Sequence, residues 1–269
     1  MPARYPERIV CLTEETTETL YLLGEQHRIV GISGYTVRPP QARREKPRVS
    51  AFLSAKIDKI LELKPDLVIG FSDLQADILR DLAKAGLDVL VFNQRSVDQI
   101  LSTILTLSAI VGAAARGRAL IERLEKGLEE IRAAAGAFRR RPRVYFEEWD
   151  EPMISGIRWV SELVAIAGGE DVFPELARSP AASGRTIAAS SEVVRRSPDV
   201  ILGSWCGKKF RPERVAARPG WSEIPAVRDG ELHEIKSADI LQPGPAALTD
   251  GVRRIHSILA AWSARHAVA

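Results

Sequence analysis

Short, continuously apolar segments alternate with amphipathic segments along most of this chain. Four of them lie in the first third, at residues 8–12 (RIVCL), 28–32 (RIVGI), 64–71 (KPDLVIGF) and 87–92 (LDVLVF). A strand that is apolar at every position is buried on both faces, as in parallel sheets that helices cover on either side. The sequence therefore predicts an α/β fold, whose first lobe comprises residues 1–96.

The pattern changes at residue 97. Ser96 and Gln99 form a candidate capping box for a helix, and after Gly112 apolar residues recur every three or four positions to about Arg140. At ~1.5 Å per residue, a helix of about 27 residues reaches roughly 40 Å, which exceeds the width of a small domain. We expect residues 97–140 to be a helical segment that includes a rigid spine helix joining two lobes.

The α/β pattern returns in residues 141–269, which end in a long amphipathic segment. One unit occurs on each side of the predicted spine: residues 60–73 (ILELKPDLVIGFSD) and residues 193–206 (VVRRSPDVILGSWC). Both have a helix end, Pro-Asp, an apolar strand, a glycine and an aromatic residue. This repeat predicts two Rossmann-like lobes with mainly parallel sheets, the second at residues 141–269 with a terminal helix.

Residues 143–156 (RVYFEEWDEPMISG) begin as a buried strand and then become acidic. Four carboxylates and an indole follow the apolar triplet within residues 147–151. Ligands of open parallel sheets bind outside the carboxyl ends of the strands. We therefore expect these side chains to leave the sheet at the rim of a cleft between the lobes, where water and a ligand both reach them.

The residues that follow the other strands are acidic, aromatic or small and polar. Alternatives to a ligand-binding role stay open for several of them. Glu14 and Glu15 could serve only the helix dipole, which favours a carboxylate by ~0.3–1 kcal/mol. Trp149 and Trp205 could be core aromatics, and Cys206 could be a buried small hydrophobe.

Composition and motifs exclude several classes of function. The net charge is +3 and the basic residues are spread, which gives nucleic-acid binding little support. No stretch reaches 18 apolar residues, so we expect no membrane span. The first ten residues lack the apolar core of an export signal, which predicts a cytoplasmic protein, with a periplasmic one as the alternative if a leader has been removed. Cys11 and Cys206 have no metal-type spacing and are expected to be free thiols, and no metal site is expected.

Catalytic motifs are missing from the sequence, which has no G-x-S-x-G, P-loop, G-x-G-x-x-G or H-E-x-x-H pattern. Glu147 and Glu148 are adjacent, so as strand residues they point to opposite faces and at most one enters a given pocket. We expect a non-catalytic binding protein that needs no cofactor. The alternatives are an enzyme that acts on the same ligand through Glu147, Glu148 and Cys206, and a scaffold that binds another protein.

Segments along nearly the whole chain resemble one family. They are RIVCLTEETTETLYLLG, VGISGY, ILELKPDLVIG, AGLDVLVFN, ELVAIAGGEDVF, RRSPDVIL and RPGWSEIPAVRDGELHEI. Together they resemble the class III, helix-linked substrate-binding proteins of ABC importers, of the type that binds cobalamin or ferric siderophores. The resemblance implies two lobes joined by a single rigid helix and a small-molecule ligand held unchanged between them.

The resemblance is greatest to the cobalamin-binding members, in which aromatic residues after the second strand and after the RVS segment face the ligand. Tyr35 and Phe52 occupy those positions here. A flat corrinoid, a haem or a ferric siderophore would pack on such rings, and Arg38 and Arg95 would pair with its acidic groups. The predicted ligand-binding residues are Glu14, Glu15, Tyr35, Arg38, Phe52, Phe71, Arg95, Glu148, Trp149, Trp205, Cys206 and Asp239.

Exported members of the family dock on a permease dimer through one acidic residue of each lobe, at the start of the helix before each Pro-Asp strand. Asp58 occupies the first position. The second aligns with Ser191, and Glu192 follows one place later, so the pair departs from the family pattern. We expect a monomer with a permease dimer as its candidate partner; a cytoplasmic relative that binds or stores its ligand is the alternative.

Overall fold

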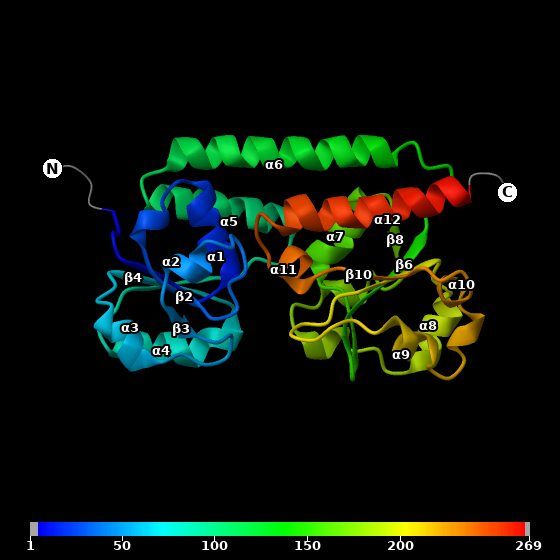
Figure 1. Cartoon of the computed structure of the whole chain (residues 1–269), viewed down its shortest axis with the longest axis horizontal. Helices are drawn as coiled ribbons and strands as arrows, with labels where there is room; N and C mark the ends of the chain where they lie inside the picture. The colour runs from blue at the N-terminus through cyan, green and yellow to red at the C-terminus, as the bar shows by residue number, and fades with distance from the viewer. Residues whose placement is uncertain (1–4, 267–269) are drawn as a thin grey trace. The chain divides into compact units, whose positions relative to one another are not determined.

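The computed structural model describes residues 5–266 of the 269-residue chain, and these fall into two compact units. Unit 1 comprises Met1–Gln94 and Asp98–Arg123, and unit 2 comprises Arg95–Val97 and Leu124–Ala269. Each unit contains its own sheet with helices around it (Figure 1). The predicted α/β class with two mainly parallel sheets is confirmed.

The sheet of unit 1 is parallel at every pairing. Across the sheet its strands are β3 (Arg48–Ser50), β2 (Ile29–Ser33), β1 (Ile9–Cys11), β4 (Leu67–Phe71) and β5 (Val89–Phe92). The chain moves outward from β1 to β2 and β3, then returns to the other side of β1 for β4 and β5. The carboxyl ends of β1 and β4 therefore mark the point where the strand order reverses, which is where ligands of open α/β sheets bind.

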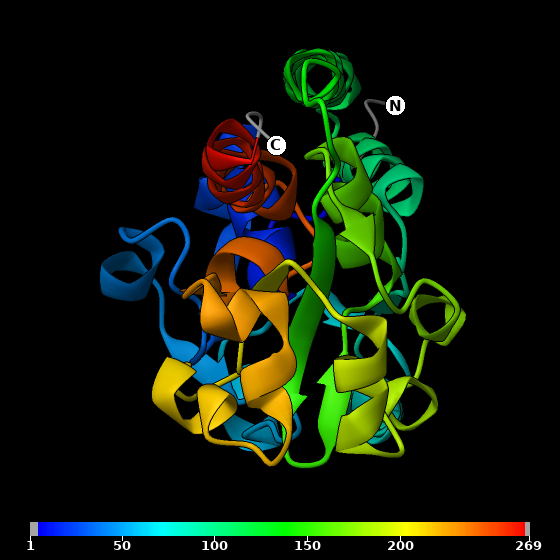
Figure 2. The same cartoon turned by 90° about the vertical axis from the view of Figure 1, so that its right-hand side faces the viewer.

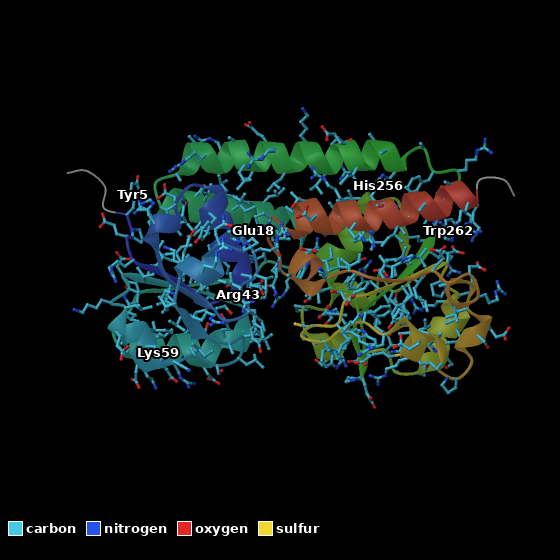
Figure 3. The ribbon with its side chains drawn as sticks, viewed as in Figure 1. Tyr5, Glu18, Arg43, Lys59, His256 and Trp262 are labelled. Carbon is cyan, nitrogen blue, oxygen red and sulfur yellow. The ribbon has the colours of Figure 1, made fainter. Side chains whose placement is uncertain are left out.

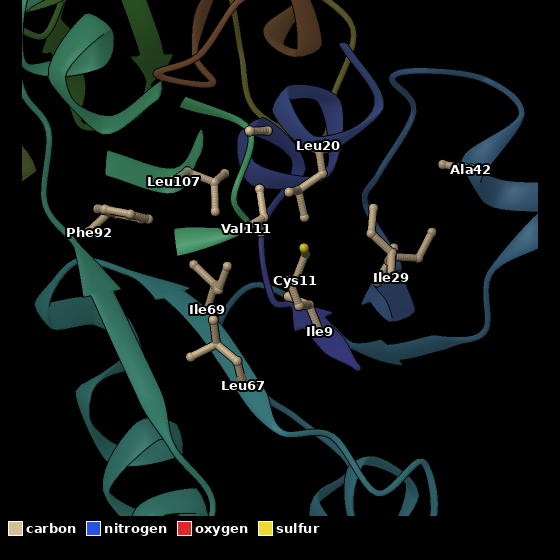
Figure 4. Packing of buried hydrophobic residues seen from close by; sticks show 12 residues of the cluster. Ile9, Cys11, Leu20, Ile29, Ala42, Leu67, Ile69, Phe92, Leu107 and Val111 are labelled. Atoms are coloured by element: carbon tan, nitrogen blue, oxygen red, sulfur yellow. The ribbon is translucent and has the colours of Figure 1, made fainter. Parts of the chain in front are cut away.

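Helices cover both faces of this sheet, with α1 and α5 on one side and α3 and α4 on the other (Figure 1). The helices of this part of the chain are α1 (Glu14–Leu22), α2 (Ala42–Glu45), α3 (Ile57–Glu62), α4 (Ala76–Lys84) and α5 (Val97–Ile110), with short 3₁₀ turns at Gln26–Arg28 and Asp73–Gln75. Ile9 and Cys11 of β1 pack with Leu20 and Leu107 in the core cluster that Figure 4 shows. Val10 packs in the cluster on the opposite face, so the all-apolar strand is buried on both sides.

Unit 2 contains a mixed sheet in which only β7 runs antiparallel to its neighbour. Its strands are β10 (Leu232–Glu234), β9 (Val200–Gly203), β6 (Arg143–Asp150) and β7 (Met153–Ser155) in that order, with β8 (Glu170–Asp171) paired to β6. Its helices are α7 (Arg158–Ile166), α8 (Ser190–Arg196), α9 (Pro212–Ala216), α10 (Pro225–Arg228), α11 (Ser237–Ile240) and α12 (Val252–Arg265), with 3₁₀ turns at Leu176–Arg178, Ala182–Arg185 and Trp221–Glu223 and a π-helical turn at Ala247–Gly251. Helices flank the sheet on both sides (Figure 2).

Helix α6 (Ala114–Ala135) is the longest helix in the described part of the chain. The boundary between the two units falls within it, between Arg123 and Leu124. Its predicted apolar stripe is buried, from Leu120 and Leu124 through Leu128 to Ile131. The helix ends at Ala135, before Gly136, and thus earlier than the predicted end at about Arg140.

The two Pro-Asp segments have the same local structure. The residue before each proline, Lys64 or Ser197, has a φ of 46°, in the left-handed region that ends the preceding helix. The carboxylate of Asp66 accepts hydrogen bonds from the backbone N–H groups of residues 7 and 8, at 2.8 and 2.9 Å. The carboxylate of Asp199 accepts one from the N–H of Arg143 at 2.9 Å. In each unit the aspartate thus pairs backbone donors at the start of the neighbouring strand, β1 or β6.

Replacing Asp199 with alanine is expected to lower the free energy of unfolding of unit 2 by roughly 2 kcal/mol, because the side chain is buried and its loss leaves the N–H of Arg143 without this acceptor. All five tryptophans lie in unit 2, so urea unfolding followed by tryptophan fluorescence reports on this unit. Glu213→Ala is the control: this exposed acid has only a loose ion pair, at 3.8 Å, so a change below ~0.5 kcal/mol is expected. Equal urea midpoints for Asp199→Ala and wild type would show that the hydrogen bond from Asp199 to the N–H of Arg143 does not stabilise the unit.

Candidate ligand-binding site

Unit 1 exposes apolar side chains at the carboxyl end of its sheet. Tyr35 follows β2 and is 58% exposed, Leu53 follows β3 and is 67% exposed, and Leu74 follows β4 and is 57% exposed. Phe52, beside Leu53, is half-buried. We call these four residues the apolar rim. Large exposed apolar side chains at one edge of a sheet indicate a surface that contacts something other than water.

One buried side chain connects the loops of the apolar rim. Gln75 is fully buried, and its Nε2 donates to the carbonyl oxygens of Leu12, at 3.4 Å, and Phe52, at 3.0 Å. Its Oε1 accepts from the N–H of Phe71 at 2.9 Å. A Cβ at Gly70 would lie 3.0 Å from that oxygen, so the close approach favours glycine there. Gln75 therefore joins the carboxyl ends of β1, β3 and β4, a role that sequence reasoning missed because its partners lie far away in the chain.

The acids at the start of α1 are buried. Glu14 and Glu15 are 7% and 3% exposed. Glu14 accepts a hydrogen bond from the N–H of Val37 at 3.2 Å, and Glu15 accepts one from the hydroxyl of Thr13 at 2.6 Å. The second carboxylate oxygen of Glu15 has no hydrogen-bond partner among the described residues.

Burial raises the pKa of Glu14 and the pKa of Glu15 to about 7, and the nearby carboxylate of Glu18 adds to both shifts. Arg43 of α2 lowers the pKa of Glu14 in part (Figure 3 labels Glu18 and Arg43). These carboxyls therefore gain or lose a proton near neutral pH. A role at the helix dipole and a role in ligand binding both stay predictions for these two acids.

Other predicted residues of unit 1 differ in their exposure. The side chain of Arg38 already has a partner within unit 1, because its Nε donates to Glu18 at 3.0 Å. Phe71 is 6% exposed and ends β4 inside the fold, so its ring offers a ligand little surface. Arg95, in the short segment assigned to unit 2, is half-buried.

The structure corrects the prediction that the acids of residues 147–151 all lie at an open rim. Glu147 is fully buried and forms a two-point ion pair with Arg218, at 2.5 and 3.0 Å. Its oxygens also accept from the indole N–H of Trp205 and from the hydroxyl of Tyr145, both at 3.0 Å. The expectation that this carboxylate lies at an open rim is wrong, because its hydrogen bonds are all made inside unit 2.

Glu148 points to the other face of β6 and has an arginine of its own. The guanidinium of Arg185, which is 2% exposed, contacts both oxygens of Glu148 at 2.6 and 3.0 Å. Asp150, two residues further, forms an ion pair with Lys208. Basic residues of the same unit thus neutralise three of the four acids of this segment, including Glu147 and Glu148, the two that were considered for catalysis.

The two tryptophans have different surroundings. Trp205 is 3% exposed and packs edge-on against Phe210, with ring centroids 5.0 Å apart, so it is a core aromatic and not a residue of an open rim. Trp149 is half-buried, and its N–H donates to the carbonyl oxygen of Glu151 at 2.8 Å. Of the two indoles, only Trp149 keeps a substantial exposed surface.

The two cysteines and Asp239 have different surroundings. Cys206 is exposed after β9, so the interpretation as a buried hydrophobe is wrong. Cys11 is buried in β1, and burial raises the pKa of its thiol to about 12. Asp239 is half-buried in the first turn of α11.

The two predicted docking acids occupy equivalent places in the units. Asp58 is exposed in the first turn of α3, which leads into β4. Glu192 is in the first turn of α8, which leads into β9, and it pairs with Arg195 at 2.7 Å. Glu192 is half-buried, and its charge is partly neutralised.

Within residues 5–266, no group of three or more His, Cys, Asp or Glu side chains is arranged to hold a metal ion. None of the helices in this part of the chain combines the length and the apolar character needed to cross a membrane.

Comparisons with known proteins identify the family of the chain. A family model described as periplasmic binding protein matches residues 9–238. The chain belongs to this family of periplasmic binding proteins. It is 25% identical over 259 residues to the uncharacterized ABC transporter substrate-binding lipoprotein YvrC of Bacillus subtilis, covering 93% of this chain and 79% of that protein. It is also 25% identical over 246 residues to the vitamin B12-binding protein of Vibrio parahaemolyticus, covering 90% and 86%.

A solved structure confirms the fold at greater evolutionary distance. A possible iron-binding (periplasmic solute-binding) protein from Staphylococcus epidermidis superimposes with a TM-score of 0.82 at 18% identity, covering 95% of this chain and 99% of that one. At that identity the match concerns the fold alone.

Family membership settles two of the alternatives. The chain is a non-catalytic substrate-binding protein of the ABC-transporter type, so the enzyme alternative is wrong. The expected cytoplasmic location is wrong as well, because the family is periplasmic and the relatives include a lipoprotein.

Proposed function

We propose that this protein captures a flat metal chelate, first of all a corrinoid, for an ABC uptake system. The observation that carries the proposal is the apolar rim, where three large apolar side chains at the carboxyl ends of the strands of unit 1 are each more than half exposed. A conjugated macrocycle has large apolar faces, and aromatic side chains cover such faces at a low entropy cost. The vitamin B12-binding relative supports the same ligand class.

The aromatic residues have separate roles in this proposal. Tyr35 and Phe52 of unit 1 offer ring faces to the chelate. Gln75 acts indirectly: its hydrogen bond to the carbonyl of Phe52 holds the loop in place. Arg38 would pair with an acidic group of the ligand only by sharing or exchanging its contact with Glu18.

We also propose that a permease dimer is the partner, contacted through Asp58 and Glu192. Both acids lie in the first turn of the helix before a Pro-Asp strand, one in each unit. The pairing of Glu192 with Arg195 makes its charge the weaker of the two attractions. A monomeric protein would present each of these acids once.

Tyr35→Ala and Phe52→Ala are each expected to weaken binding of cyanocobalamin by about 1–2 kcal/mol, because each variant removes a ring from the proposed contact surface. Titration followed by tryptophan fluorescence gives the dissociation constant, and mass spectrometry of the recovered ligand should show it unchanged. Leu105→Ala is the matched control, since this side chain is 43% exposed on α5 but is not part of the apolar rim.

The same titration with haemin and with a ferric siderophore separates the members of the ligand class. If haemin or the siderophore binds more tightly than cyanocobalamin, that compound and not a corrinoid is the ligand, and the proposed class of metal chelates still holds. Wild-type affinity in both rim variants for every chelate that binds would reject the apolar rim as the site.

A further inference from the structure

Unit 2 contains a box of two indoles and a carboxylate at the carboxyl ends of β6 and β9. It consists of Trp149, Asp150 and Trp205, and we call it the cation box. The ammonium of Lys208 lies 3.9 Å from the ring centroid of Trp149 and 5.1 Å from that of Trp205. The same ammonium forms an ion pair with Asp150. Indole faces and a carboxylate around one cation are the features by which proteins recognise ammonium groups.

The walls of the cation box are held in place by contacts that do not involve Lys208. The N–H of Trp149 donates to Glu151, and the N–H of Trp205 donates to Glu147, at 2.8 and 3.0 Å. Each indole is thus anchored by a hydrogen bond that does not depend on the occupant. Such preorganisation lowers the cost of binding a new occupant.

The charge of Asp150 requires a cation in the box. Its side chain is only 6% exposed, and a buried carboxylate without a partner is strongly destabilising. Burial alone would raise the pKa of Asp150, but the hydrogen bond and positive charge of Lys208 hold it below its usual range. The guanidinium of Arg214 is further away, at 3.9 Å, and supports the charge without filling the box.

The occupant comes from an exposed loop, residues 206–209. Lys208 follows Gly207, which has a φ of 77°, in the loop between β9 and α9, and its side chain is 36% exposed. Its backbone N–H makes a long bond of 3.4 Å to the carbonyl of Trp205. Ordering a lysine side chain costs rotamer freedom, which is regained when the ammonium returns to water.

We propose that the cation box is a binding subsite for a primary ammonium group, and that Lys208 is a built-in occupant which an incoming amine replaces. A primary ammonium reproduces the charge, the size and the three donors of the lysine head group. The proposal relies on the proposed function only in taking the amine to be part of the captured ligand. It adds a class of substituent that the apolar rim of unit 1 does not select.

The test uses n-butylammonium as the probe and 1-butanol as its neutral counterpart. Lys208→Ala empties the box, and its tryptophan fluorescence should change saturably with n-butylammonium but not with 1-butanol. Wild type should bind the probe about tenfold more weakly, because the tethered lysine competes at a high effective concentration. Adding Asp150→Asn to the Lys208→Ala variant should weaken binding by about tenfold. Lys209→Ala, at the exposed neighbouring position, should behave as wild type.

A measurement on the wild-type protein tests the proposal even if the variants fail to fold. The Lys208 ammonium lies 3.9 and 5.1 Å from two indole ring centroids. The NMR signals of the adjoining ε-methylene protons should therefore be shifted upfield and should move toward normal values as n-butylammonium is added. No saturable binding to Lys208→Ala, equal binding after Asp150→Asn, or Lys208 signals that do not respond would each overturn the proposal. Because no chelate is used, failure here leaves the proposed function to its own test.

Discussion

Replacing Arg218 with methionine is expected to lower the free energy of unfolding of unit 2 by about 3–5 kcal/mol. Glu147 is fully buried, and Arg218 makes a two-point ion pair with it. Removing one partner of a buried ion pair leaves an uncompensated charge in a medium that solvates it poorly. Urea unfolding followed by tryptophan fluorescence measures the loss, since all the tryptophans lie in unit 2.

A double variant separates the charge from the packing. Glu147→Gln together with Arg218→Met removes both charges and keeps similar volumes, so it should recover a large part of the loss. Arg211→Met is the surface control, because its side chain is 55% exposed and its ion pair is loose. If the double variant is as unstable as Arg218→Met alone, the loss comes from packing and the buried-charge argument is wrong.

Unit 1 is expected to lose stability as the pH rises from about 4.5 to about 7. The pKa of Glu14 and of Glu15 is about 7 in the folded protein, against an ordinary value of 4.5. Between these values the folded state binds more protons than the unfolded state. The stabilisation is therefore complete below pH 4.5 and is lost as the pH rises through 7. The expected loss is on the order of 3 kcal/mol for each carboxyl.

Urea unfolding followed by far-UV circular dichroism at a series of pH values measures this loss. A Glu14→Gln and Glu15→Gln double variant carries neutral side chains at all pH values, so the difference from wild type isolates the two carboxyls from other titrating groups. The free energy of unfolding of wild type minus that of the double variant should fall as the pH rises from about 4.5 to about 7. A curve that is flat between pH 4.5 and 7 would show that the two carboxyls titrate normally.

The local sequence pattern determined the architecture of this protein. Apolar runs such as residues 8–12 indicate strands buried on both faces, and the structure packs Ile9 and Val10 into clusters on opposite sides of the sheet. The Pro-Asp repeat marks one equivalent strand in each unit. Such features depend only on residues that are close together in the sequence, so they can be predicted from the sequence directly.

The polar partners of the candidate site were decided only by tertiary structure. Glu147 and Glu148 looked like exposed rim acids, yet their arginines come 71 and 37 residues later in the chain. Gln75 likewise reaches Leu12 and Phe52 from 63 and 23 residues away. No local pattern specifies such pairs, because the free energy of burying a charge or an amide depends on what the fold places beside it. The positions of the strand ends follow from the order of residues, whereas the chemistry they present follows from the side chains that folding brings to them.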